Sequence, residues 1–288
     1  MNKIIDKELS NMNIEHDYIT EIRSKNGISV YRVVHGDESY VLKYFMNDSD
    51  RREIENYYIL NSLGIMTLHL IFSTQSALLM EDIEQSNTYR LGNADDLNDI
   101  DVAVQIAKWY KELHSKGKHF VSSYKGSLYD ETDVITKTNI DFIKSKTSTE
   151  SNPVWESLFH NFDFVKENIA KAERTLTYND FYYTNLIVSK DKSSAFMFDY
   201  NLLGKGYVFL DIRNVCSSLS EHAKAAFLKE YGEFNQKEMI VDNVVSPLTT
   251  LYFACKRNTF PKWAEASLLQ VKNGQLLNNI NLMVKAEI

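Results

Sequence analysis

The sequence predicts an α+β protein built as two lobes, and three observations support this prediction. Alternating β-type runs fill the first third of the chain and helical periodicity dominates the rest. The 288 residues, 44% of them hydrophobic, supply material for one large or two modest cores. We therefore expect an N-terminal lobe with a five-stranded antiparallel sheet and one main helix. The C-terminal lobe should be mostly helical, with short hairpins.

The N-terminal lobe is expected to begin with a short helix at residues 3–12. Five runs with period-two alternation follow, at residues 18–24, 29–35, 39–45, 68–72 and 77–80. Lys25-Asn26-Gly27 and Gly36-Asp37 separate the first three runs, and both are typical of hairpin turns. These runs predict the five strands of one sheet.

A lysine stands on an apolar face of the third run. Alternation places Lys43 on the same side as Val41 and Phe45. A lysine in such a position needs a carboxylate or a phosphate as its partner. The sequence therefore predicts an ion pair or a phosphate contact at Lys43.

The main helix of this lobe is expected at residues 51–60, with Asp48 or Ser49 as its cap. Helical spacing turns Glu53 inward, whereas Glu55 lies on a different face. We expect Glu53 to be the partner of the lysine in the third run, with Glu55 as the second candidate.

The rest of the chain reads mostly as helices. Apart from a polar segment at residues 84–101, the helical patterns cover residues 102–114 (ending at Gly117), 129–145, 151–173, 212–219, 221–231, 236–257 and 261–284. Pro247 should kink or split one of them. Three short strands interrupt this pattern, at residues 176–178, 186–188 and 195–198.

The three short strands frame the most informative stretch of the sequence. The first strand stops at Asp180, and the other two form a hairpin around the turn Ser189–Ser194. Asn185 stands at the entry of this hairpin and Asp199 at its exit. We therefore expect three oxygen donors to converge at one point.

Such a group of oxygen donors suits a hard cation. Magnesium is usually held by one or two carboxylates together with waters and substrate phosphates. Asn185 and Asp199 could hold the metal, which leaves Asp180 free to receive a proton from an attacking hydroxyl. This division of roles is that of phosphoryl transfer.

These residues also carry a family resemblance. Tyr178–Val188 resembles the catalytic loop of the aminoglycoside phosphotransferase and choline kinase superfamily, whose members are relatives of protein kinases. Phe198-Asp199 matches the metal-binding aspartate of that family, and Gly204–Ile212 matches its glycine-to-aspartate segment. The family usually has His-Gly where this chain has Tyr178-Asn179. The resemblance covers most of the chain and implies a bilobal protein-kinase-like fold.

The resemblance also assigns roles in the N-terminal third. It implies that Ser24 to Ile28, with Gly27 at the turn, lies over the phosphates of a nucleotide, and that Lys43, oriented by Glu53, contacts the α and β phosphates. Leu78–Ile83 resembles the hinge between lobes, so the lobes would be residues 1–83 and 84–288. Adenine would contact the main chain of Glu81 and Ile83, with Met80 beside the base. Asp211 is expected to be an N-cap or a brace under the catalytic loop.

The implied cofactors are Mg²⁺ and a phosphoryl donor, ATP or GTP, and the implied partner is a small hydroxylated acceptor. An aminoglycoside needs an acidic pocket, which residues 84–101 and 130–141 could supply, whereas residues 201–288 contain ten basic and eight acidic residues. Tyr182 and Tyr183 could instead form a cation–π site for choline or ethanolamine. The residues leave the acceptor open.

Two rival classes are less consistent with the sequence. A catalytically silent nucleotide-binding regulator would usually lose Asp180, Asn185 or Asp199, and all three are present. A protein kinase needs an activation segment, but only eleven residues separate Asp199 from Asp211. We therefore favour a small-molecule phosphotransferase.

The composition indicates the compartment and the kinds of partner that we expect for this protein. Cys216 and Cys255 lie in helical patterns and predict buried free thiols in a reducing compartment. Residues 1–10 have no apolar core typical of a signal peptide, and no run reaches the length of a membrane span. The net charge is −7, and a strongly basic patch is absent from the sequence. We expect a cytoplasmic protein that binds neither membrane nor nucleic acid.

Overall fold

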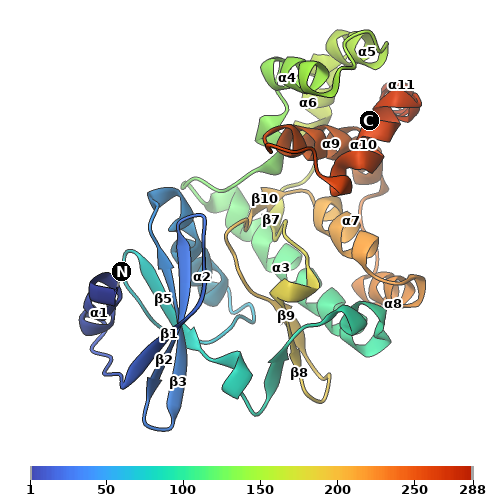
Figure 1. Ribbon diagram of the computed structural model, residues 1–288. Helices are drawn as coiled ribbons and strands as arrows, with labels where there is room; N and C mark the ends of the chain where they lie inside the picture. The colour runs from blue at the N-terminus through green and yellow to red at the C-terminus, as the bar shows by residue number, and fades with distance from the viewer. Residues whose placement is uncertain (1, 287–288) are drawn as a thin grey trace. The chain divides into compact units, whose positions relative to one another are not determined.

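The computed structural model describes residues 2–286 and has the predicted α+β composition (Figure 1). The chain forms two compact units, and neither is continuous in the sequence. The first contains the residues up to Lys116, then Asp180–Leu203 and Asn214–Gly232; the second contains Gly117–Asn179, Gly204–Arg213 and the residues from Glu233 onward. The predicted lobe boundary after Ile83 stays a prediction.

A five-stranded antiparallel sheet forms the N-terminal part of the first unit, as predicted. Its strands are β1 (Tyr18–Lys25), β2 (Ile28–His35), β3 (Glu38–Phe45), β4 (Leu70–Ser73) and β5 (Ala77–Glu81), in the order β1-β2-β3-β5-β4. The first two strands meet at Asn26-Gly27, where both residues have a positive φ, as the predicted hairpin turn requires. Register and turn chemistry therefore agree.

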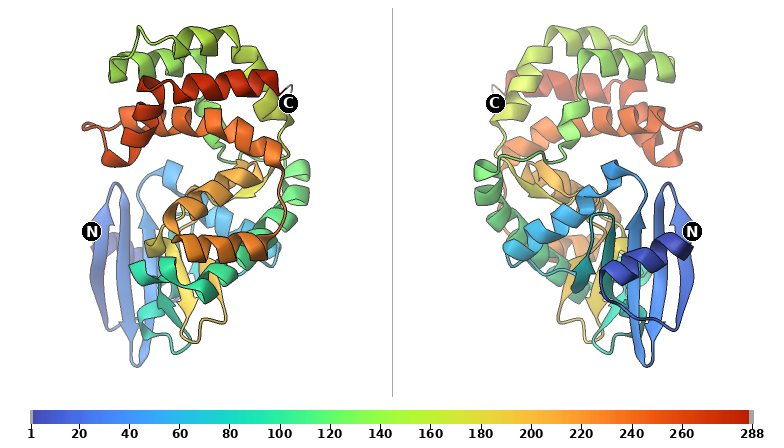
Figure 2. Two further views of the ribbon diagram at one scale, coloured as in Figure 1. Left: turned by 90° about the vertical axis from the view of Figure 1, so that its right-hand side faces the viewer. Right: turned by 90° about the vertical axis from the view of Figure 1, so that its left-hand side faces the viewer.

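Two helices pack on opposite faces of this sheet. Helix α1 (Asn2–Asn11) lies over one face of the sheet (Figure 2). It buries Ile5 and Leu9 in a cluster that includes Leu42 of β3. The next residue along β3 is Lys43, which contacts helix α2 (Arg52–Ser62). Because side chains alternate along a strand, the two contacts lie on different faces.

The start of α2 differs from the prediction. Asp48 and Ser49 do not cap the helix but belong to a 3₁₀ turn, Asp48–Asp50. Arg51 occupies the N-cap position, and its side chain makes no capping hydrogen bond. The tight turn continues almost directly into the helix, so the capping position falls later than the residue types suggest.

A second sheet in the first unit contains a strand that the sequence analysis missed. Strand β6 (Tyr89–Leu91) pairs with β8 (Leu186–Ser189), and β8 pairs with β9 (Ala195–Met197), all antiparallel. The β8–β9 hairpin confirms the predicted one. A three-residue strand inside a polar segment is too short to show alternation, and only its pairing with β8 reveals it.

Helix α3 (Ile100–Ser123) runs through Gly117, where the sequence analysis placed its end. A Cβ atom at position 117 would lie 2.7 Å from the Cβ of Leu176, closer than any real contact allows. The glycine is therefore needed for close packing against strand β7 (Thr175–Thr177) and does not end the helix.

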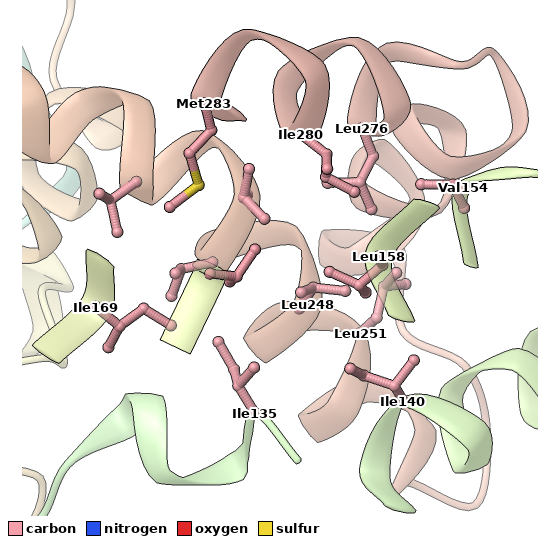
Figure 3. Packing of buried hydrophobic residues seen from close by; sticks show 14 of the residues in the cluster. Ile135, Ile140, Val154, Leu158, Ile169, Leu248, Leu251, Leu276, Ile280 and Met283 are labelled. Atoms are coloured by element: carbon pink, nitrogen blue, oxygen red, sulfur yellow. The ribbon is translucent and has the colours of Figure 1, made fainter. Parts of the chain in front are cut away.

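The second unit holds most of the remaining helices. They are α4 (Lys137–Thr147), α5 (Val154–His160), α6 (Phe162–Lys171), α9 (Gln236–Cys255), α10 (Glu265–Lys272) and α11 (Gln275–Lys285). Side chains from these helices meet in one apolar core, with Leu158, Leu248 and Ile280 at its centre (Figure 3). The core explains why the helices form in this part of the chain.

Four helix predictions for the C-terminal part need correction. The pattern at residues 129–145 is a 3₁₀ turn, Glu131–Val134, followed by α4. The pattern at residues 151–173 is two helices, α5 and α6, and the pattern at residues 261–284 is a 3₁₀ turn followed by α10 and α11. Gly274, at φ +82°, interrupts the last of these patterns. Helix α9 is not split at Pro247. Periodicity continued across these breaks because apolar residues on both sides face the same core.

Helices α7 (Val208–Ser218) and α8 (Glu221–Tyr231) follow strand β10 (Gly204–Gly206), which pairs with β7. The α8 bounds match the prediction, whereas α7 starts four residues before the predicted residue 212. Cys255 is buried, Cys216 is half-buried, and both thiols are free. Across residues 2–286, no helix combines the length and apolar character that a membrane span requires.

Candidate active site

The β8–β9 hairpin brings together Asn185 and Asp199, which are fourteen residues apart. Leu186 pairs with Met197, and one step further the N–H of Phe198 donates to the carbonyl oxygen of Asn185 at 2.9 Å. Asn185 therefore precedes one strand and Asp199 follows the other at the same end of the ladder.

Asp180 joins this group through a side-chain hydrogen bond. The Nδ2 of Asn185 donates to Oδ2 of Asp180 at 2.9 Å and to its carbonyl oxygen at 3.2 Å. These bonds occupy the amide nitrogen of Asn185, so its Oδ1 is the atom suited to bind a cation. The predicted convergence of two acids and one amide is present in the first unit.

Lys43 connects this group to helix α2. Its Nζ lies 2.8 Å and 2.7 Å from the two carboxylate oxygens of Glu53 and 2.9 Å from Oδ1 of Asp199. Lys43 is 8% exposed and Glu53 is 1% exposed, whereas the second candidate, Glu55, is exposed. Burial alone would lower the pKa of Lys43, but the charges of Glu53 and Asp199 raise it above its ordinary value.

The two aspartates carry like charges close together. Burial and the charge of Asp199 raise the pKa of Asp180 to about 6, while the hydrogen bond from Asn185 and the charge of Lys43 oppose this shift. A divalent cation between these oxygen donors would relieve the repulsion. The donor set therefore fits Mg²⁺, which prefers carboxylate and carbonyl oxygens.

The raised pKa gives a direct spectroscopic prediction. In metal-free protein labelled with ¹³C-aspartate, the carboxyl resonance of Asp180 should titrate near pH 6, because an acid with a raised pKa stays protonated below that pH. Burial also raises the pKa of Asp242 to about 6, so a second resonance should titrate there and should persist in Asp180→Asn. The Asp180 resonance should be missing from Asp180→Asn. Addition of Mg²⁺ should move the titration of Asp180 to lower pH, since a cation favours the carboxylate. An unchanged titration with Mg²⁺ would contradict the assigned cation site.

Two residues of this stretch adopt a left-handed backbone. Asn179 has φ +65° and Asp199 has φ +63°. Among residues with a side chain, asparagine and aspartate tolerate this region best. The conformation accounts for the Asn179 that stands where the resembling family has glycine, because both residue types can adopt it.

Asp211 is fully buried in the second unit. Its two carboxylate oxygens accept hydrogen bonds from the N–H groups of Tyr178 (2.8 Å) and Asn179 (2.9 Å), the two residues that precede Asp180 in the chain. The N-cap prediction for Asp211 was wrong, because it lies in the first turn of α7. The hydrogen bonds are those that a brace would make.

Asp211→Ala should lower the free energy of unfolding by about 2 to 4 kcal/mol, because two buried N–H groups lose a charged acceptor. Asp163→Ala is the matched control, since Asp163 lies in the first turn of α6 but is exposed. It should cost less than about 1 kcal/mol. Urea unfolding of both variants measures the difference. Equal losses would show that the hydrogen bonds of Asp211 contribute nothing specific.

The predicted hinge is a buried end of strand β5. Met80 and Ile83 are buried, and Sδ of Met80 accepts a hydrogen bond from the hydroxyl of Tyr57 at 3.2 Å. The N–H of Glu81 donates to the carbonyl oxygen of His69 at 3.1 Å. A contact between adenine and Glu81 would therefore use the carbonyl oxygen of Glu81.

The sequence analysis missed Asp82, which ties the hinge to the sheet. Its Oδ2 accepts hydrogen bonds from Nε of Arg32 at 2.6 Å and from Oγ of Ser39 at 2.7 Å. Burial opposes ionisation, but these hydrogen bonds hold the pKa of Asp82 below its ordinary value. The available signal was an acidic residue directly before Ile83, at the end of a passage that begins with the apolar run Leu78–Met80.

Ser24 and Gly27 lie at the β1–β2 turn. Oγ of Ser24 and Oγ of Ser29 are 2.8 Å apart across the hairpin. The carbonyl oxygen of Gly27 accepts from the N–H of Met46, and a Cβ atom at Gly27 would lie 2.2 Å from Nδ2 of Asn47. The turn is therefore held by the end of β3, and its contact with phosphates stays a prediction.

No protein-family model and no curated protein matches this sequence. Solved structures do match it. The chain is similar to a choline kinase from Streptococcus pneumoniae, with 14% identity, a TM-score of 0.65, and coverage of 95% of this chain and 98% of that one. A macrolide 2′-phosphotransferase from Brachybacterium faecium gives 11% identity, a TM-score of 0.62, and coverage of 94% and 98%.

A spectinomycin phosphotransferase, solved with ADP and spectinomycin, gives 14% identity, a TM-score of 0.54, and coverage of 94% of this chain and 93% of that one. The similarity spans nearly all of each chain while sequence identity is low, so it establishes the fold. This chain therefore has the α+β fold of these solved choline kinase, macrolide phosphotransferase and spectinomycin phosphotransferase structures.

Proposed function

We propose that this protein is a small-molecule kinase that transfers the γ-phosphate of ATP or GTP to a hydroxyl of a small acceptor. One observation carries the proposal: the hydrogen-bonded pair Asp180 and Asn185 lies close enough to the bonded pair Asp199 and Lys43 for the charges of that second pair to shift the pKa of Asp180. Glu53 is buried behind the lysine. If Lys43 and Glu53 formed only a structural ion pair, that pair would not need Asp180 and Asn185 close to Asp199. The spectinomycin phosphotransferase solved with ADP supports a nucleotide as donor.

In the proposed reaction, Asp180 accepts the proton of the acceptor hydroxyl as its oxygen attacks the γ-phosphorus. The new oxygen–phosphorus bond forms while the bond from the γ-phosphorus to the bridging oxygen breaks, and the nucleoside diphosphate leaves. Lys43, held by Glu53, contacts the α and β phosphates. When Mg²⁺ is bound by Asn185 and Asp199, it neutralises charge on the phosphates.

The nucleotide is proposed to lie between the β1–β2 turn and the hinge. Ser24 and Gly27 would cover the phosphates, and the main chain of Glu81 and Ile83 would hold adenine beside Met80. The support is geometric: the turn is fixed by Met46 and Asn47, and the hinge is fixed by Asp82. Fixed main-chain groups bind a planar base with little loss of conformational entropy.

A choline or ethanolamine acceptor is the second candidate, and the exposure of two aromatic side chains favours it. Tyr182 is 58% exposed and Tyr183 is 38% exposed, and they stand two and three residues after the proposed base Asp180. Exposed tyrosine rings can bind a quaternary ammonium group through cation–π attraction. An aminoglycoside would depend more on acidic side chains.

The decisive experiment measures nucleoside diphosphate release with Mg·ATP and Mg·GTP against a panel of acceptors. The panel contains aminoglycosides, choline, ethanolamine, sugars and homoserine. Stimulation by one class above the rate without acceptor supports the proposal and identifies the acceptor. Labelled ATP with casein separates a protein kinase from a small-molecule kinase. Nucleotide binding without transfer to any acceptor would favour a silent regulator and overturn the proposal.

A further inference from the structure

The turn that follows Asp199 is closed by one buried amide of helix α2. Asn56 is 5% exposed, and its Nδ2 donates to the carbonyl oxygen of Tyr200 at 2.7 Å and reaches that of Leu203 at 3.5 Å. Within the turn, the N–H of Leu203 donates to the same Tyr200 carbonyl oxygen at 3.0 Å. Asn56 therefore contacts both ends of the turn.

An asparagine at position 56 is less favourable than a leucine unless its side-chain hydrogen bonds stabilise the fold. Asparagine is a weaker helix former than leucine or alanine. A buried amide without hydrogen bonds costs several kcal/mol, whereas a leucine would gain from burial. Asn56 is buried beside Tyr57, which is also buried, on the helix face that includes Leu60. Its contacts with the turn are the feature that a leucine could not supply.

Two further contacts fix the same turn from the same helix. A hydrogen bond joins Glu53 to the backbone of Tyr200. The ring of Tyr57 meets the ring of Tyr200 edge to face, with 4.7 Å between the centroids. Three inward positions of α2 therefore hold Tyr200, which itself is fully buried.

The residue before Tyr200 needs such support. Asp199 adopts φ +63°, a conformation that is strained for a residue with a side chain. Neighbouring contacts must hold it there. Its Oδ1 lies 2.9 Å from Nζ of Lys43, so a change in the turn would redirect the carboxylate.

We propose that Asn56 is a positioning residue: it fixes the turn at Tyr200–Leu203 and so keeps the Asp199 carboxylate directed at the cation site. The inference rests on the proposed function, because it assigns the cation to Asp199. Asn56 touches neither the nucleotide nor the acceptor in this assignment. It acts through the main chain of Tyr200.

The test replaces the amide with a side chain of similar size that cannot donate, Asn56→Leu, with Asn56→Ala as a second donor-free variant should the leucine not fold. Asn168→Leu is the matched control. Asn168 is 2% exposed, belongs to the second unit, and donates from Nδ2 to a main-chain carbonyl oxygen, that of Phe164, at 2.9 Å. Both substitutions therefore remove a buried side-chain amide that donates to a main-chain carbonyl oxygen.

Two measurements do not depend on turnover. Hydrogen exchange of the peptide that covers Asp199–Leu203 should be about tenfold faster in Asn56→Leu, because Asn56 no longer holds the turn closed. Mn²⁺ binding in the presence of ADP, followed by electron paramagnetic resonance, should weaken about tenfold. Affinity for ADP without metal should stay within about twofold. Asn168→Leu should change none of these values.

Faster exchange together with weaker Mn²⁺ binding supports the positioning role. Unchanged Mn²⁺ binding in Asn56→Leu overturns it, even if exchange is faster, and so does an equal effect of Asn168→Leu. Measurements on wild-type protein separate a failure of the proposed function from a failure of the role of Asn56. If wild-type protein binds no Mn²⁺·ADP, the proposed function fails first, whereas normal binding by wild type and variant alike removes only the role of Asn56.

Discussion

Asp199→Ala is expected to abolish detectable phosphoryl transfer, a loss of at least about 10³-fold. The carboxylate is bonded to Lys43 at 2.9 Å and is the proposed charged ligand of the cation. Its removal leaves one amide as protein ligand and takes away a partner of the lysine. Because the transition state of phosphoryl transfer is stabilised mainly by positioning and charge neutralisation, losing the metal ligand should have the largest effect of any single substitution.

The measurement is the rate of nucleoside diphosphate release at saturating Mg·ATP and acceptor. Asp191→Ala is the matched control, because Asp191 belongs to the turn of the same hairpin and its carboxylate accepts from the N–H and hydroxyl of Ser193 and from Ser189, all within that hairpin. It should retain the wild-type rate within about twofold. Turnover by Asp199→Ala at the rate of the control would remove Asp199 from the cation site.

Asp180→Asn is expected to lower kcat by about 10²- to 10⁴-fold, the usual range for loss of a general base. Asparagine keeps the size of the side chain and an oxygen that can accept the 2.9 Å hydrogen bond from Asn185, but it cannot take a proton from the acceptor hydroxyl. The fold and the nucleotide site should therefore persist.

Two constants separate this effect from a binding defect. The Kd for Mg·ADP, measured by calorimetry, should change less than about threefold, while kcat falls. The contrast with Asp199→Ala is informative, because that variant should lose affinity for Mg·ADP as well. Normal turnover by Asp180→Asn would exclude Asp180 as the base, and equal losses of binding in both variants would assign Asp180 to the metal as well.

Most of the first sheet could be predicted because its signals are local. Alternating side chains at residues 18–45 and the Asn26-Gly27 turn predicted three strands and the first hairpin, and the structure confirms them. The irregular pairing of β1 between Glu21 and Arg23 was not predicted. Strands β6 and β10 could not be predicted. Each has three residues, and each exists only because a partner from a distant part of the sequence supplies its hydrogen bonds.

The helix boundaries show the same limit. Gly117 looked like a helix end because glycine is common there, yet it lies inside α3, where a side chain would collide with Leu176. Apolar periodicity also ran across the breaks between α5 and α6 and between α10 and α11, since both helices of each pair face one core. Whether a glycine or a polar residue ends a helix depends on what packs against it.

The sequence indicated some residues of the candidate site but not all of their partners. The spacing of Asp180, Asn185 and Asp199 around a hairpin indicated convergence, because a hairpin returns the chain to its starting point. Asn56 shares the inward face of Glu53, which was visible in the helical spacing. Its partner, the carbonyl oxygen of Tyr200, was not visible, because main-chain groups carry no sequence signal.

Alternation, turn residues and hairpin spacing act over short stretches of chain, so they were enough to predict the fold class, the Lys43–Glu53 pair and the candidate cation ligands Asn185 and Asp199. The bond from Lys43 to Asp199 and the buried amide that fixes the turn after Asp199 became visible only in the folded chain. These contacts depend on burial. A charged or amide group withdrawn from water must find a partner, and that partner is fixed by which surfaces the folded chain brings into contact.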